Sequence, residues 1–218
     1  QLGGSFGAGY GNYNDLHLDA AINVPLGSNA AARLAGTLNK HDGYLSDGTN
    51  DADSWALRGQ LLFEPTDAIT IRLSGDYSHD GGLGNGSVIS SYINPLTGAA
   101  TINPLPRNVG LADARSAAIF AGQYSFLSGR FGRGIIEKPF TDNDYWGIKA
   151  EIGANLGFSN LTVLASKRGS TLNGLDFGVG FPAYTDQKDN QFSLEARLAS
   201  PDEGLFRWLV GGYYYDEN

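Results

Sequence analysis

The chain has 218 residues, 15 of them basic and 23 acidic, for a formal net charge of −8 at pH 7. It contains 31 glycines and no cysteine, and charged residues make up 17%, below the roughly 25% of a typical soluble domain. This composition excludes a disulfide scaffold, a zinc centre with cysteine ligands and thiol catalysis, and the acidic balance argues against a protein that binds nucleic acid.

The sequence contains no methionine, which is expected of a processed chain or of a fragment of a longer one. Its first residues show no basic segment followed by an apolar one, so we expect no signal peptide. No run of 18 apolar residues occurs, so we expect no transmembrane helix. These expectations do not exclude a protein that crosses a membrane with strands.

Apolar residues recur at every second position along most of the chain, which is the period of a β-strand with one apolar face. Nine strands are predicted, in chain order, over 6–10, 15–24, 30–40, 54–63, 69–78, 146–158, 161–167, 192–198 and 206–214. No segment keeps a 3.6-residue period long enough to predict a helix. The predicted fold class is therefore all-β.

Charged side chains occupy the face of these strands opposite the apolar one. The residues predicted to face the lumen of a barrel are Arg58, Arg72, Asp76, Lys149, Glu151, Glu195 and Arg197. On the apolar face, Trp55 and Phe63 stand at the two ends of one strand, and Trp146 and Phe158 at the ends of another. Eight residues tilted at about 45° rise about 19 Å, which approaches the apolar band of about 25 Å in outer-membrane barrels.

The connections alternate between tight turns and long polar segments. The turns, built from Pro, Gly, Asp, Asn and Ser, cover 25–29, 64–68, 157–160 and 200–204. The long connections cover 42–53, 79–143 and 168–189. Short turns at one rim and long loops at the other are typical of outer-membrane β-barrels, so 79–143 is predicted to be a long extracellular loop.

Several stretches resemble the barrel strands of TonB-dependent outer-membrane receptors. Ala-Ala-Ile-Asn-Val-Pro-Leu-Gly at 20–27 follows Tyr-Gly-Asn-Tyr at 10–13, and Gln-Phe-Ser-Leu-Glu-Ala-Arg-Leu-Ala-Ser at 191–200 precedes Trp-Leu-Val-Gly-Gly-Tyr-Tyr-Tyr-Asp-Glu at 208–217. Further matches lie at 33–36, 42–44 and 142–147. The resemblance implies that 1–218 is part of an antiparallel transmembrane β-barrel of 22 up-and-down strands, with the plug domain and the remaining strands absent.

The same resemblance implies the function and the partners. Such a receptor lies in the bacterial outer membrane, captures a ferric siderophore, cobalamin or oligosaccharide, and imports it with energy from the TonB system. The implied partners are outer-membrane lipid, the protein's own plug domain, the TonB complex and a small-molecule ligand. A passive porin and a soluble β-sandwich adhesin remain as alternatives.

The sequence predicts no enzyme, no cofactor and no metal centre. The three histidines, His17, His41 and His79, are far apart and are predicted to occupy ordinary polar positions. An acidic loop offers an alternative, since it could hold calcium although it lacks the ligand spacing of a known calcium loop. Its carboxylates are those of Asp42, Asp47, Asp51 and Asp53.

The long connection between 79 and 143 carries a local excess of positive charge. The residues predicted to bind ligand are Arg107, Arg115, Tyr124, Phe126, Arg130 and Arg133. A guanidinium binds a carboxylate through two hydrogen bonds and aromatic rings add apolar contact, so this pattern favours an anionic, partly aromatic ligand.

Overall fold

The computed structural model describes residues 2–94, 97–119, 138–176, 182–201 and 206–218. Its strands are β1 (Gly3–Tyr10), β2 (Leu16–Pro25), β3 (Ala30–His41), β4 (Ala52–Thr66), β5 (Ile69–Gly82), β6 (Ser91–Ile93), β7 (Ala100–Ile102), β8 (Phe140–Asn155), β9 (Asn160–Asp176), β10 (Ala183–Ala199) and β11 (Leu209–Glu217). A 3-10 turn, η1 (Asn12–Asn14), joins β1 to β2, and 114–119 form a short α-helix. That helix corrects the expectation of a chain without helices.

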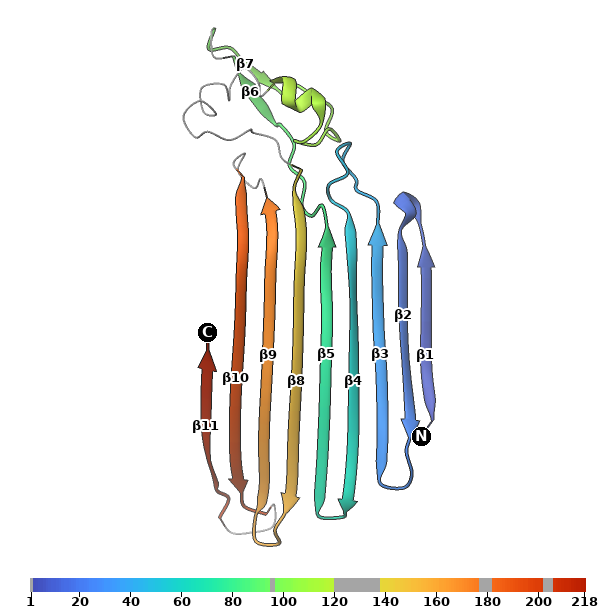
Figure 1. The fold of residues 1–218 in the computed structure, drawn as a ribbon, viewed down its shortest axis with the longest axis vertical. Helices are drawn as coiled ribbons and strands as arrows, with labels where there is room; N and C mark the ends of the chain where they lie inside the picture. Colours follow the sequence, from blue (N-terminus) through green and yellow to red (C-terminus); the bar gives the residue numbers. More distant parts are fainter. Residues whose placement is uncertain (1, 95–96, 120–137, 177–181, 202–205) are drawn as a thin grey trace.

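Nine long strands form one antiparallel sheet in the order β1-β2-β3-β4-β5-β8-β9-β10-β11 (Figure 1). Each long strand pairs with its neighbour in sequence, and the β6–β7 ribbon lies at the rim above the sheet. The prediction of an all-β, up-and-down antiparallel fold is confirmed. Within the described ranges no second sheet packs on either face of this one, as a β-sandwich would require.

The register separates the sheet into an apolar face and a polar face. Leu57 lies opposite Tyr77, which lies opposite Trp146, while Arg58 lies opposite Asp76. Because side chains alternate along a strand and directly paired residues share a face, these pairings assign the regularly paired positions of the long strands to one face or the other. The seven charged residues predicted to share a face do so.

The apolar face is exposed because the sheet is a single layer. Ile148 is 58% exposed and Val210 is 59% exposed. The buried apolar side chains among the described residues are Val109 and Pro139, in the long connection, and Leu175, near the upper end of β9. Most of the apolar surface that a folded domain usually buries is thus exposed on this sheet. Its apolar face is stable only where something apolar covers it.

Several strands extend farther than their hydrophobic pattern predicts. β9 and β10 continue to Asp176 and from Ala183, so the predicted connection 168–189 narrows to 177–182. The predicted loop 79–143 likewise narrows to 83–139. Both faces of these upper strand segments carry polar residues, so the backbone ladder continues where the apolar alternation has ended.

Phe158 does not lie on a strand, in contrast to the sequence prediction. β8 ends at Asn155, Leu156 donates its N–H to the carbonyl of Ser159 at 2.9 Å, and Gly157 has a φ of 83°. Glycine adopts this left-handed conformation without steric cost, so the chain reverses here and leaves Phe158 at the tip of the turn, 71% exposed. Among the described residues, no helix has the length and apolar character to span a membrane.

Candidate functional site

The polar face of the sheet carries ion pairs, some between strands and some within one strand. Arg72 on β5 binds Glu151 on β8, with Nη1 and Oε1 3.1 Å apart, and Lys149 approaches the other oxygen of Glu151 at 3.3 Å. On β10, Arg197 Nε lies 3.2 Å from Glu195 Oε1. Six of the predicted lumen-facing charges therefore neutralise one another or a neighbour, since Asp76 also has a partner, Arg168. The face is polar without a large net charge.

Arg168 is a residue of this face that the sequence analysis missed, because the predicted strand ended at residue 167. Its Nη2 lies 3.1 Å from Asp76 Oδ2. Arg168, Asp76 and Arg58 line an open hollow of about 540 Å³ together with Asp19 of β2. The alternation of the strand, continued by one residue, would have placed Arg168 on the polar face.

Above the sheet, the β3–β4 loop is bound to the long connection by carboxylates that accept backbone N–H groups. Asp51 accepts hydrogen bonds from Leu83 at 2.9 and 3.0 Å and from Gly84 at 2.9 Å. Asn50 adds two bonds, accepting from Gly86 through its side chain and donating its own N–H to the carbonyl of Gly84. These two loops therefore form one hydrogen-bonded unit.

Asp47 ties the same loop to a later part of the long connection. Its Oδ1 accepts from the hydroxyl of Thr49 at 2.6 Å, and its Oδ2 accepts from the N–H of Ala112 at 3.0 Å. Thr49 and Val109 are each only 1% exposed, so the unit has a small packed interior. We call the unit formed by 42–51 with 83–94 and 97–117 the loop cap.

The contacts in and beside the loop cap explain the four aspartates for which calcium binding was the alternative prediction. Asp47 and Asp51 bind backbone N–H groups, Asp53 pairs with Lys40 at 3.0 Å, and Asp42 accepts from Asn14 at 2.5 Å. Within the described ranges these four carboxylates do not gather into a cation site. Their role is to hold backbone and side chains together.

Of the predicted ligand-binding residues, two lie in the described part of the chain. Arg107 is exposed in the loop cap. Arg115 is also exposed, but its guanidinium makes two hydrogen bonds to Asp113, at 2.9 and 2.8 Å, and Ser46 donates a third to the same carboxylate at 2.6 Å. The remaining four, Tyr124, Phe126, Arg130 and Arg133, lie outside the described residues.

The contacts of Asp113 set its charge state. The hydrogen bonds from Arg115, followed by the one from Ser46, hold the pKa of the Asp113 carboxyl well below its usual range, and the pKa of Arg115 is raised in turn. The pair stays ionised at physiological pH, so the positive charge of Arg115 is neutralised locally. Arg107 is therefore the better placed of the two cations to attract an anion.

Comparison with known proteins identifies the fold. No protein-family model and no curated protein matches the chain. It does match, at 14% identity, the FpvAI–pyocin S2 complex (TM-score 0.68), Pseudomonas aeruginosa FpvA bound to a heterologous pyoverdine–iron complex (0.66), and the ferripyoverdine receptor of the outer membrane of Pseudomonas aeruginosa bound to ferripyoverdine (0.67). The matches cover 99–100% of this chain and 28% of those chains. The fold is thus that of a section of such a receptor, as the resemblance to TonB-dependent receptors predicts.

Proposed function

We propose that the chain is a wall section of a bacterial outer-membrane transport receptor, which captures a scarce nutrient and imports it with energy from the TonB system. The observation that carries this proposal is that the whole of this chain matches a section of the ferripyoverdine receptor. Its open sheet also has one apolar and one polar face. The plug domain and the TonB complex are the further components that this function needs.

The exposed apolar face supports a location in a membrane. Along β8 it runs from Ala154 to Trp146, and eight residues tilted at about 45° rise about 19 Å, comparable to the hydrocarbon band of an outer-membrane barrel. Above this band the same face becomes charged, beginning with the Lys40–Asp53 pair. Lipid would cover the apolar face, and the polar face with Arg58, Arg72 and Glu151 would line the lumen.

A ferric siderophore is the nutrient class that we favour. Two of the matched structures hold pyoverdine–iron complexes, and the exposed Arg107 lies in the loop cap, at the rim where the long connections emerge. A cation at that place suits an anionic ligand. Tyr124, Phe126, Arg130 and Arg133 remain proposed ligand contacts on the sequence pattern alone.

Transport by the intact protein that contains this section tests the proposal. Cells that express it under iron limitation should accumulate ⁵⁵Fe supplied as ferric siderophore, and a protonophore that collapses the energy supply should stop the accumulation. The purified protein in liposomes should not let small sugars diffuse. Energy-independent accumulation together with sugar diffusion would instead identify the passive porin.

A further inference from the structure

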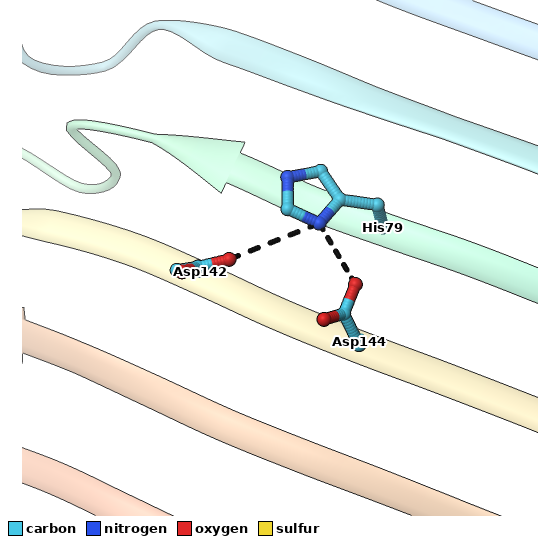
Figure 2. A group of neighbouring side chains, drawn as sticks. All are labelled: His79, Asp142 and Asp144. Atoms are coloured by element: carbon cyan, nitrogen blue, oxygen red, sulfur yellow. Dashed lines mark hydrogen bonds and ion pairs between the residues drawn. The ribbon is translucent and has the colours of Figure 1, made fainter.

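Three metal-ligating side chains converge at the upper end of the apolar face, next to the base of the loop cap (Figure 2). They are His79 on β5 and Asp142 and Asp144 on β8. His79 lies directly opposite Asp144 in the register, and Gly81 lies opposite Asp142, so the three side chains share one face. His79 is more than 60 residues from the two aspartates in the sequence, and the β5–β8 pairing brings it beside them.

The donor atoms point toward a common centre. His79 Nδ1 lies 2.9 Å from Asp144 Oδ1 and 3.9 Å from Asp142 Oδ1, and one donor atom from each residue falls within 4.8 Å of the others. Around a tetrahedral zinc ion with bonds of about 2.0–2.2 Å, neighbouring ligand atoms are roughly 3.3–3.6 Å apart. The two separations from His79 bracket that value, and the separation between the two carboxylates is at most 4.8 Å. Side-chain rotations that bring the carboxylates closer together would place all three atoms around an ion.

We propose that His79, Asp142 and Asp144 bind a divalent transition-metal ion of the Zn²⁺ class. An imidazole nitrogen with two carboxylate oxygens suits zinc and its neighbours in the first transition row, whereas calcium and magnesium prefer oxygen ligands alone. Three protein ligands leave a coordination position for water or for an external ligand.

The surroundings orient two of the ligands. Tyr77 Oη donates a hydrogen bond of 2.6 Å to Asp144 Oδ1, and the Tyr77 ring stacks on Trp55 with centroids 5.3 Å apart. The indole of Trp55 also lies beside the imidazole of His79, at 6.2 Å. Hydrogen bonds to a ligating carboxylate fix its orientation, and their loss commonly weakens metal binding about 10- to 100-fold.

The position of the site gives the metal a structural consequence. β5 and β8 are adjacent in the sheet but are joined by the longest connection of the chain, 83–139. An ion held by both strands would cross-link them where this connection begins and ends. The site is independent of the proposed transport function, because it faces away from the polar side of the sheet.

Zinc titration of the intact protein, purified in detergent and stripped of metal, tests the proposal. Isothermal titration calorimetry should show one Zn²⁺ bound per chain, and Zn²⁺ should raise the melting temperature. His79→Gln and Asp142→Asn should each weaken binding at least about tenfold. The matched control is His41→Gln, which removes an imidazole outside the cluster and should leave the affinity unchanged.

Tyr77→Phe is the second variant, because it keeps every ligand and removes only the hydroxyl that orients Asp144. We expect it to weaken zinc binding about 10- to 100-fold while the Co²⁺-loaded protein keeps the absorption spectrum of a nitrogen–oxygen site. Absence of zinc binding by the folded wild-type protein would overturn the proposal. So would an affinity unaffected by His79→Gln, or displacement of Zn²⁺ by a modest excess of Ca²⁺.

Discussion

Arg168 on β9 reaches Asp76 on β5 across the whole width of the strand that separates them. Nη2 and Oδ2 are 3.1 Å apart, and the residue of β8 that lies between the two in the register is Gly147. A Cβ at Gly147 would stand 2.8 Å from Arg168 Nη1 and 3.3 Å from Asp76 Oδ2. The absence of a side chain at this position is what allows an ion pair to span three strands.

Gly147→Val should abolish the coupling between Arg168 and Asp76. The Arg168 side chain is 53% exposed and that of Asp76 is 30% exposed, so solvent screens the pair. A double-mutant cycle of Arg168→Gln and Asp76→Asn should give a coupling of about 0.2–1 kcal/mol in the wild-type background. In the Gly147→Val background the coupling should vanish. Urea unfolding of the intact protein in detergent measures both cycles, and an equal coupling in the two backgrounds would show that the glycine is not required.

Leu61→Arg should destabilise the protein by about 2–4 kcal/mol, because Leu61 lies along the apolar face and, in the proposed membrane location, a guanidinium there enters hydrocarbon. Gln60→Arg is the matched control, since Gln60 is the next residue on the same strand and lies on the polar face. The free energy of unfolding from lipid bilayers is the quantity to measure. Equal costs at the two positions would rule out the assignment of the faces to lipid and lumen.

The period of two was enough to predict the nine strands and the residues that share a face, because a strand with one apolar and one polar face shows that pattern in the sequence. It could not predict the strand ends. Thr171 and Asn173 of β9 lie on the same face as Trp146, but they are polar, so nothing in the sequence distinguishes their ladder from a loop.

The contacts above the sheet could not be predicted from the sequence for a different reason. Asp51 and Leu83 are 32 residues apart and lie in connections without any periodicity, so only the three-dimensional course of both loops brings them together. His79 was likewise interpreted as an ordinary polar residue, because its two carboxylate neighbours lie beyond the long connection.

Asp51→Ala should loosen the loop cap. The N–H groups of Leu83 and Gly84 would lose their acceptor, and an unsatisfied, partly buried donor costs about 1–3 kcal/mol. Limited trypsin digestion should then cut faster after Arg107. Asp53→Asn is the control, because the Asp53 carboxylate pairs with the exposed Lys40 rather than with the N–H groups of Leu83 and Gly84, and the change should leave the rate of cleavage unchanged. Equal cleavage of the Asp51→Ala variant and the wild-type protein would contradict the role of Asp51.

The Asp113 contacts should resist mild acid. The folded-state pKa of this carboxyl is depressed, so its contribution to stability is complete above the unfolded-state value of 3.8 and is lost only as the pH falls below it. Hydrogen-exchange protection of the Ser46 amide, corrected for the intrinsic rate, should therefore be the same at about pH 6 and about pH 4.5. Asp113→Asn should lower that protection at both values. A loss of protection in the wild-type protein between about pH 6 and about pH 4.5 would show that the pKa of the Asp113 carboxyl is not lowered in the folded state.

Arg107→Gln should weaken capture of an anionic ferric siderophore more than Arg115→Gln. Attraction between charges acts only within roughly 8–10 Å at physiological salt, so a capturing residue must meet the ligand directly with a charge that is not already neutralised. Arg107 is exposed in the loop cap, whereas the guanidinium of Arg115 is held by both oxygens of Asp113. Loss of one charge-assisted hydrogen bond is worth about 1.5–3 kcal/mol, which corresponds to roughly a 10- to 150-fold rise in Kd for Arg107→Gln.

The measurement is ligand-induced fluorescence quenching of the intact protein with a panel of ferric siderophores, repeated at low and high salt. Asp113→Asn tests the same idea in the opposite direction. This change leaves Arg115 without its counter-charge. Arg115→Gln should therefore raise the Kd for the siderophore in the Asp113→Asn background, whereas in the wild-type background it should leave the Kd nearly unchanged. The contradicting outcome is that Arg115→Gln weakens binding as much as Arg107→Gln in the otherwise wild-type protein. The Arg115–Asp113 ion pair would then separate when the ligand binds, and neutralisation by Asp113 would not decide which arginine captures the ligand.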